Sequence, residues 1–338
     1  MNKVSIILLG YGNIGKAFVE RIEKQKSFFL SNFDLDIEFL LIVRSKTYCK
    51  KNQWFDLTNP FRLLQETFLE YPDKKYIIVD CTAAESMIDL YLSIKDVKAC
   101  IIAANKAPLA VEYTKYLKLQ NHFKSNNIAF FHEATVGAGL PIIKPIKSLV
   151  QSGDLIHSIQ GVFSGTLTYL FSQVNEPFST RLQSAYDLGY TEPDPRVDLS
   201  GLDVARKCLV LARMIGSTLS LSDIIIESLI PDNLESVCVD DFFNEIKSYD
   251  VVISKRESLA HSNNQKLCYM GIITKDSIQV GLETVDNLSD FSTLTGTSNL
   301  IEVKSGYYPD TYSIKGPGAG IEVTVNGLFS DFLAAILV

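Results

Sequence analysis

Short apolar runs alternate with helical patterns through the first 140 residues of the chain. Mainly apolar runs of strand length occur at Val4–Leu9, Ile37–Val43, Tyr76–Asp80, Ala99–Ala104 and Ile128–His132. Helical spacing of apolar residues occurs between them, at Ile14–Lys26, Met87–Ile94 and Leu109–Phe123. Strands that are apolar throughout are buried on both faces, and helical connections place neighbouring strands parallel. We therefore predict an α/β architecture with a parallel sheet covered by helices.

The pattern changes after about residue 140. Helical spacing dominates from about residue 164 to 250, with the longest predicted helix at Gly201–Ile215. From Lys266 onward apolar and polar residues alternate, which predicts an antiparallel sheet. Ser258–Lys266 is predicted to be a surface loop, and Ile321–Ile336 a final helix. This second part of the chain is predicted to be an α+β domain.

A glycine-rich motif, Gly10-Tyr11-Gly12-Asn13-Ile14-Gly15, joins the first predicted strand to the first predicted helix. In this context Gly10 permits a tight turn, Gly12 lets the backbone approach a pyrophosphate, and Gly15 lets helix and strand pack closely. The helix N-terminus adds N–H groups and partial positive charge. We therefore predict a doubly wound, Rossmann-type sheet that binds a dinucleotide through Gly10, Gly12, Asn13, Ile14 and Gly15. A glycine-rich turn in another α/β fold is the alternative.

Polar residues at the ends of other strands predict further contacts to the cofactor. A carboxylate at the end of the second strand would bind the adenosine ribose of NAD, but this sequence has Arg44 and Lys46 there. We therefore favour NADP over NAD, since these cations can bind a 2′-phosphate; the alternative is that both are solvated loop charges. Thr82, Asn105 and Lys106 follow the next two strands, at the edge where open α/β sheets bind ligands.

Composition excludes several other classes of protein. The 338 residues are 46% hydrophobic and 21% charged, as in an ordinary globular protein, and the length predicts two domains. A net charge of −7 argues against a nucleic-acid partner. Six cysteines without a C-x-x-C pair and four scattered histidines argue against a disulfide scaffold or a zinc site. Since no apolar run has the length of a membrane span, we predict a cytoplasmic protein that does not bind membranes.

A dense group of charged residues lies between Gly189 and Lys207. Prolines stiffen the loop that carries Glu192 and Asp198. The predicted helix after this loop is almost entirely apolar, so we expect the helix to be buried. Asp203 and Lys207 are four residues apart on that helix and share one face. A buried pair costs desolvation energy, so we interpret it as part of a functional site rather than as a surface salt bridge.

The same residues resemble the signature of the homoserine dehydrogenase family. The run from Leu188 to Pro195, together with Asp198, Gly201, Asp203 and Lys207, matches this signature almost residue for residue. Three further blocks agree, in the order of the family: residues 132–141, 161–169 and 316–320. The resemblance spans nearly the whole chain. It implies NAD(P)-dependent interconversion of L-aspartate 4-semialdehyde and L-homoserine, in the biosynthesis of threonine, methionine and isoleucine.

The resemblance also implies roles for the matching residues. Lys207 would donate and accept the proton at the substrate oxygen, with Asp203 and Lys106 as the other catalytic residues. The implied substrate-binding residues are Glu192, Asp198, Asp203, Tyr190, Thr166 and Gly165. Gly189 and Gly320 would border the cofactor. These residue types suit the reaction, because an alkoxide that receives a proton needs an acid and positive charge, and an ammonium needs carboxylates.

Further features are implied by the resemblance alone. Glu133, Val136, Ala138 and Leu140 match sodium-binding positions, and oxygen ligands suit such a hard cation. Residues 1–136 and 321–338 would form the dinucleotide-binding domain, and residues 137–320 the catalytic and dimerisation domain of a homodimer. Only 18 residues follow Gly320, so we expect a short form that lacks a C-terminal regulatory domain or fused kinase.

The chain departs from the family pattern in its C-terminal glycine block. Pro317 stands where the family usually has Ala, and the following helix carries Thr324, Asn326 and Gly327 in place of small apolar residues.

Two other functions are weighed against this one. An aldehyde-oxidising dehydrogenase with a cysteine nucleophile would use Cys81 or Cys100, but neither has a recognisable histidine partner, and buried thiols are the better interpretation. A nucleotide-sensing regulator that has lost catalysis should also have lost the acid–lysine group, which this sequence retains.

Overall fold

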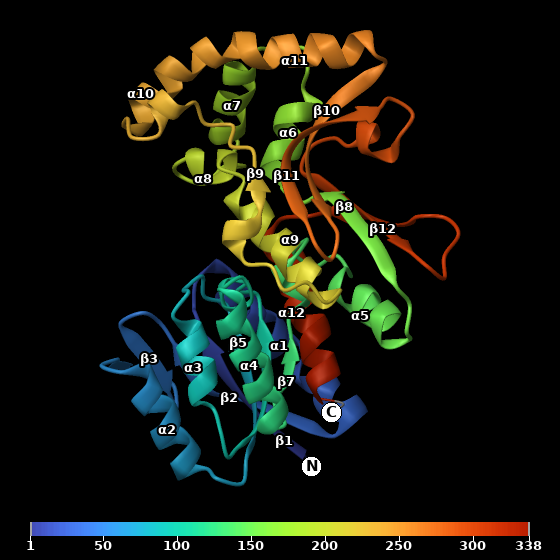
Figure 1. Ribbon diagram of the computed structural model, residues 1–338. Helices are drawn as coiled ribbons and strands as arrows, with labels where there is room; N and C mark the ends of the chain where they lie inside the picture. Colours follow the sequence, from blue (N-terminus) through green and yellow to red (C-terminus); the bar gives the residue numbers. More distant parts are fainter. Residues whose placement is uncertain (1, 337–338) are drawn as a thin grey trace. The chain divides into compact units, whose positions relative to one another are not determined.

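The structure, a computed structural model, describes residues 2–336. It separates into two units, Met1–Pro141 with Gly320–Val338, and Ile142–Ala319 (Figure 1). Residues 1, 337 and 338, which the predicted dinucleotide-binding domain includes, lie outside the described residues. Within residues 2–336, no helix is both long and apolar enough to cross a membrane.

A seven-stranded sheet forms the centre of the first unit. Its strands are β1 (Asn2–Leu9), β2 (Leu35–Val43), β3 (Thr47–Lys50), β4 (Gln53–Asp56), β5 (Lys75–Asp80), β6 (Lys98–Ala103) and β7 (Ala129–Phe131). Their order is β4-β3-β2-β1-β5-β6-β7, and the five strands from β2 to β7 are parallel. The chain passes from β1 to β2 on one side and later to β5 on the other, so the strand order reverses at β1. This confirms the predicted doubly wound parallel sheet.

Helices cover both faces of this sheet (Figure 1). One face packs against α1 (Asn13–Phe33) and α12 (Ile321–Ile336), through alternate strand residues such as Ile6 and Leu8. The other face packs against α2 (Pro60–Glu70), α3 (Met87–Ser93) and α4 (Tyr113–Ser125), through the intervening residues such as Ile7. Two short 3₁₀ helices, η1 (Ala107–Leu109) and η2 (Glu133–Thr135), follow β6 and β7. Burial on both faces explains why the central residues of these strands are mainly apolar.

The second unit contains a six-stranded sheet with the order β13-β12-β8-β10-β11-β9. The strands are β8 (Ile156–Val162), β9 (Ile225–Ile226), β10 (Gln265–Ile273), β11 (Ile278–Asp286), β12 (Ser298–Ser305) and β13 (Tyr312–Pro317). Neighbouring strands are antiparallel, except that β9 pairs parallel with β11. Pro317 ends β13 at the edge of the sheet, where a missing N–H group is tolerated.

The helices of the second unit are α5 (Ile143–Gln151), α6 (Gly165–Ser172), α7 (Phe178–Asp187), α8 (Arg196–Leu199), α9 (Leu202–Met214), α10 (Val239–Glu245) and α11 (Asp250–Ser262). Four 3₁₀ helices join them: η3 (Leu221–Asp223), η4 (Asp232–Leu234), η5 (Ile246–Tyr249) and η6 (Asp290–Thr293). Both α6 and α9 pack against β10. The helix predicted over Gly201–Ile215 is α9, and the predicted antiparallel sheet is confirmed.

One prediction for this unit is wrong. The expected loop Ser258–Lys266 is mostly regular structure, because α11 continues to Ser262 and β10 begins at Gln265. Only Asn263 and Asn264 turn the chain, with Asn264 at a φ of 57°. Asn263, Asn264 and Gln265 suggested the loop, but the turn is confined to the first two of them, and α11 before it has only Ile253 and Ala260 buried.

Candidate active site

The glycine motif forms the turn between β1 and α1. Gly10 has a φ of 90°, and a Cβ atom there would lie 2.8 Å from the carbonyl carbon of Cys81. A Cβ on Gly15 would lie 2.1 Å from the carbonyl oxygen of Gly10. Both positions therefore require glycine. In contrast, the space around Gly12 is open to 4 Å, and α1 begins directly after it at Asn13. The turn thus leaves room for a phosphate in front of the first N–H groups of the helix.

A cavity of about 570 Å³ lies beside this turn, within the range of small-molecule sites. It is lined by Leu9, Gly10, Tyr11, Gly12, Val43, Arg44, Ser45, Leu57, Thr58, Pro60, Phe61, Thr82, Ala84, Ser86, Met87 and Leu90. Arg44 is the one charged residue of this lining. The cavity therefore combines the glycine turn, the end of β2 and the loop after β5, as expected for a ligand at the carboxyl ends of the strands.

Asp80 organises the loops after β5 and β6. Its carboxylate is fully buried and accepts hydrogen bonds from the Thr82 backbone N–H (2.7 Å), the Tyr91 hydroxyl (2.5 Å) and the Asn105 amide (3.2 Å). Burial raises the pKa of Asp80, and these donors counteract the shift. Asn105 also donates to the Thr82 hydroxyl (3.1 Å) and to the carbonyl oxygen of Ala84 (3.0 Å). The structure thus brings the predicted residues Thr82 and Asn105 together.

Lys106 follows Asn105 and is half-buried at the start of η1. The Asn105 side-chain oxygen accepts the N–H group of Ala107 at 3.0 Å, which fixes the chain on both sides of Lys106. Sequence reasoning missed Asp80 and Tyr91 in this network. An acid that ends an otherwise apolar strand, with no base beside it, was the available signal for Asp80.

In the second unit, α9 carries the predicted acid–lysine pair. The Lys207 ammonium lies 2.8 Å from the Asp203 carboxylate and donates to the carbonyl oxygen of Phe163, also at 2.8 Å. The Lys207 side chain is 15% exposed and that of Asp203 40% exposed. The helix buries its apolar residues from Val204 to Ala212, so this pair lies on its more open side.

A second set of hydrogen bonds, around Asp198, connects the segment before α9 to α6. Asp198 accepts hydrogen bonds from the Thr166 hydroxyl (3.0 Å) and from the backbone N–H of Glu192 (2.8 Å). The Thr166 hydroxyl also donates to the carbonyl oxygen of Tyr190 at 2.6 Å. Burial raises the pKa of Asp198, and the negative charges of Glu192 and Asp203 raise it further, while both hydrogen bonds lower it. The three carboxylates therefore lie close enough to interact.

Three other predicted residues are glycines. Gly165 is the first residue of α6 and packs against Thr297. A Cβ atom on Gly165 would lie 2.9 Å from the Cβ atom of Thr297. Gly189 has a φ of 70°, and a Cβ there would meet no heavy atom within 4 Å beyond its chain neighbours. Gly320, in the first unit, has a φ of 118° and directly precedes α12. The positive φ angles explain glycine at positions 189 and 320.

The residues predicted to bind sodium form a tight turn in the first unit. Glu133 is 2% exposed, and its backbone N–H donates to the Asp331 carboxylate at 2.7 Å. Ala138 has a φ of 56°, in the left-handed region. A Cβ on Gly327 would lie 2.7 Å from the carbonyl oxygen of Ala138, so α12 approaches the turn closely only because residue 327 is glycine. Within residues 2–336, no cluster of three or more His, Cys, Asp or Glu side chains is placed to hold a metal.

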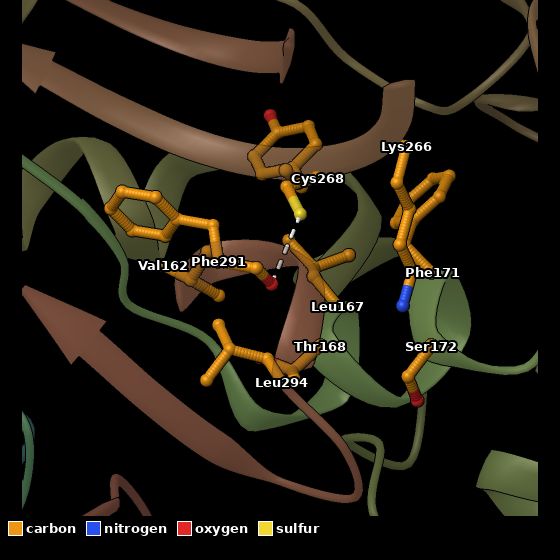
Figure 2. A pocket seen from close by; sticks show the side chains of 10 residues that line it. Val162, Leu167, Thr168, Phe171, Ser172, Lys266, Cys268, Phe291 and Leu294 are labelled. Carbon is orange, nitrogen blue, oxygen red and sulfur yellow. Dashed lines mark hydrogen bonds between the residues drawn. The ribbon is translucent and has the colours of Figure 1, made fainter. Parts of the chain in front are cut away.

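A much smaller cavity, of about 10 Å³, lies beside α6 (Figure 2). It is lined mainly by apolar side chains, and the Cys268 thiol beside it donates to the carbonyl oxygen of Phe291 at 3.8 Å. Its volume admits about one water molecule. None of the predicted site residues lines it, so it is a packing defect of the second unit rather than a substrate site.

The cysteines do not resemble nucleophiles. Burial raises the pKa of both Cys81 and Cys100, which favours the unreactive thiol. All six cysteines are free. This argues against the alternative of a dehydrogenase with a cysteine nucleophile.

The doubly wound sheet, with its glycine turn and open cavity, defines a dinucleotide-dependent oxidoreductase. Comparison with known families gives two matches, to the NAD binding domain of homoserine dehydrogenase over residues 10–133 and to homoserine dehydrogenase over residues 141–333. The chain belongs to the homoserine dehydrogenase family of NAD(P)-dependent oxidoreductases.

Individual relatives agree with this assignment. The chain is 34% identical over 350 residues to a homoserine dehydrogenase of Saccharomyces cerevisiae, with 98% of this chain and 97% of the yeast protein covered. It is 36% identical over 351 residues to a bifunctional aspartokinase/homoserine dehydrogenase of Zea mays. That match covers 98% of this chain but only 38% of the maize protein. A crystal structure of a Candida auris protein of unknown function matches with a TM-score of 0.90 and 29% identity, over 99% of this chain and 98% of the other.

Proposed function

We propose that this chain catalyses the interconversion of L-homoserine and L-aspartate 4-semialdehyde, as a homoserine dehydrogenase. The observation that carries the proposal is the Lys207 ammonium, held by the Asp203 carboxylate and the Phe163 carbonyl oxygen. Two further carboxylates, of Glu192 and Asp198, belong to the same part of the second unit. Membership of the family supports the same reaction.

Most of the residues that would hold the nicotinamide cofactor belong to the first unit. Gly10, Gly12, Asn13, Ile14 and Gly15 would contact the pyrophosphate, since the turn is open in front of Gly12. Thr82, Asn105, Lys106, Gly189 and Gly320 are the other proposed cofactor residues. When bound, the nicotinamide supplies or accepts the hydride.

We propose NADP as the preferred cofactor. Arg44 is the one charged residue lining the cavity, and no carboxylate lines it to accept a hydrogen bond from the ribose 2′-hydroxyl of NAD. A guanidinium suits a 2′-phosphate because charge-assisted hydrogen bonds to phosphate are strong.

The substrate's ammonium would be bound by the carboxylates of the second unit. Asp198 is fixed by the Thr166 hydroxyl and the Glu192 backbone, which orients its charge. Glu192 and Asp203 add two more charges close to it. Tyr190 and Gly165 belong to the same segments, and we propose that they shape the substrate site around these carboxylates.

Lys207 would move the proton at the substrate oxygen. An ammonium has three N–H groups, and the two contacts to Asp203 and Phe163 leave one of them for the substrate. During aldehyde reduction Lys207 donates this proton to the oxygen that becomes an alcohol, and during homoserine oxidation it accepts the proton. Asp203 balances its charge and orients it. Lys106 is the third proposed catalytic residue, and its ammonium would supply positive charge to the reaction.

The segment Glu133–Leu140 fits a monovalent cation. It offers one buried carboxylate, from Glu133, and a sharp turn whose backbone carbonyls include that of Ala138. One carboxylate with neutral carbonyl oxygens suits a hard, singly charged ion such as sodium. The sodium ion would be held by Glu133, Val136, Ala138 and Leu140. Its positive charge would stabilise the packing of this segment against α12.

We also propose a homodimer in the cytoplasm that serves the biosynthesis of threonine, methionine and isoleucine. Six free cysteines support a reducing compartment. Both the dimer and the pathway are proposed from membership of the family, and not from particular residues of this chain.

A steady-state assay tests the proposal. Homoserine oxidation is measured with NADP and with NAD, each with sodium or with potassium as the only added alkali cation. We expect turnover that is faster with NADP and that increases with sodium. A chain that binds NADPH but oxidises no homoserine with either cofactor would instead be a nucleotide-sensing regulator.

A further inference from the structure

The β3–β4 ribbon places the chain's single tryptophan, Trp54, against the predicted cofactor cation. The ribbon is antiparallel and extends the parallel sheet beyond β2, next to the point where Arg44 follows that strand. The Arg44 guanidinium carbon lies 4.2 Å from the centre of the Trp54 ring and 5.0 Å from that of Tyr11. The two rings are 6.0 Å apart, so guanidinium and rings form one three-membered cluster.

Aromatic rings, rather than an acid, hold Arg44. Within residues 2–336, no carboxylate forms an ion pair with its guanidinium, and its backbone N–H donates to the Thr47 carbonyl oxygen at 2.7 Å. Cation–π contacts attract a guanidinium to ring faces without neutralising it. The N–H edge of Arg44 therefore keeps its full charge beside the cavity, and its side chain loses less freedom when an anion binds.

The position of Trp54 is otherwise unfavourable. Its side chain is 45% exposed on a ribbon whose four β4 residues are all exposed, so it adds little to the core. The neighbouring Phe55 is equally exposed, at 45%, but stacks on Tyr48 at 5.4 Å instead of on Arg44. Two adjacent aromatic residues with the same exposure thus contact different groups: Trp54 contacts the Arg44 cation, and Phe55 contacts the Tyr48 ring.

We propose that Trp54, with Tyr11, is a positioning residue that sets the preference for a nucleotide with a phosphate on its adenosine ribose. Trp54 acts through Arg44, by holding the guanidinium where this phosphate binds. The proposal rests on the dinucleotide site of the proposed function, and names the residue that makes this site selective.

Calorimetric titration of the full chain with NADPH and with NADH tests the proposal. For Trp54→Leu we expect NADPH affinity to fall about two- to fivefold, the range of an exposed cation–π contact. NADH affinity should stay within about 1.5-fold of the parent value, which is less than the loss of such a contact would cause. Phe55→Leu is the matched control, and both affinities should stay at the parent values. Trp54→Phe keeps a ring and should restore part of the NADPH preference.

Other outcomes are equally informative. Equal losses of NADPH and NADH affinity in Trp54→Leu would mean a merely structural ribbon and would overturn the proposal, as would the same selective loss in Phe55→Leu. If Trp54→Leu does not fold, the ratio of NADPH affinity to NADH affinity is measured for Trp54→Phe and Tyr11→Leu instead. A ratio that equals the parent value in both variants would overturn the proposal. Homoserine oxidation by the parent chain is measured separately, so failure of this proposal and failure of the proposed function are distinguishable.

Discussion

Lys207 and Asp203 form a salt bridge one helical turn apart, with 2.8 Å between the ammonium nitrogen and the nearer carboxylate oxygen. An exposed pair with this spacing would contribute little. Here the Lys207 side chain is 15% exposed and a backbone carbonyl oxygen accepts a second N–H group, so the direction of the ammonium is fixed. Fixed direction is what a proton donor requires, since proton transfer needs hydrogen-bond geometry at the reacting oxygen.

We predict that Lys207→Met removes most turnover and leaves cofactor binding intact. Loss of a general acid–base group costs about 10²- to 10⁴-fold in rate, whereas the cofactor cavity lies wholly within the first unit. Steady-state kinetics and calorimetry with NADPH provide the measurements. Lys304→Met, at an exposed position in β12, is the control and should behave as the parent. Turnover within threefold of the parent would refute the role of Lys207.

Gly201 is predicted to be irreplaceable because of Tyr269. Its φ is 71°, and a Cβ there would lie 2.0 Å from the Tyr269 hydroxyl, which donates to the Glu227 carbonyl oxygen at 2.6 Å. Gly201→Ala should lower the free energy of unfolding by about 2–4 kcal/mol through strain and overpacking. In a double-mutant cycle, Tyr269→Phe should recover part of this loss. If the losses in unfolding free energy of the two single variants, measured with urea, simply add in the double variant, the Tyr269 hydroxyl is not the cause of the strain at residue 201.

The pH dependence of stability should contain a contribution from Glu38. Burial raises the pKa of this carboxyl, but hydrogen bonds from Lys74, Ser5 and Lys3 outweigh burial and lower the pKa to about 2. The folded state thus holds the charged form more strongly than the unfolded chain does. This stability is present above the unfolded value of 4.5 and is lost as the pH falls from 4.5 to about 2. In urea unfolding, Glu38→Gln should therefore be less stable than the parent at pH 7, and the difference should shrink toward pH 2. A difference that is constant over this range would contradict the assignment.

Two buried asparagines should respond in opposite ways to replacement by leucine. Asn299 is fully buried, and neither polar atom of its amide has a hydrogen-bond partner within residues 2–336. Asn105 is 4% exposed and makes four side-chain hydrogen bonds. An unpaired buried amide costs about 1–3 kcal/mol, so Asn299→Leu should be neutral or stabilising, and Asn105→Leu destabilising by about 2 kcal/mol or more. Equal losses in thermal unfolding would show that Asn299 is paired in solution.

Local patterns predicted many, but not all, of the elements that have a buried face. The glycine turn, the parallel strands and α9 follow from periodicity and from steric needs within a few residues of chain. The β3–β4 ribbon and α2 were not predicted, and the ribbon could not be, because β4 has no buried residue and so no alternation.

Contacts between distant segments were equally invisible in the sequence. Arg181 in α7 is 1% exposed and pairs with Glu257 of α11 at 2.8 Å. Nothing near either residue in the sequence indicates the partner. For the same reason only the Asp203–Lys207 pair, which is close in sequence, was predicted as a contact, whereas Asp80 and Tyr91, which hold Thr82 and Asn105, emerged only from the fold.

The ring of Trp54 gives the chain an internal optical probe. It is the only tryptophan among 338 residues, and it stacks on the one cation that faces the cavity. Its ultraviolet emission therefore comes from a single place in the molecule, and occupation of the neighbouring cavity should alter that emission without any added label. Filling of the nucleotide site can then be followed in real time in the unmodified protein, even when no substrate is present and no turnover occurs.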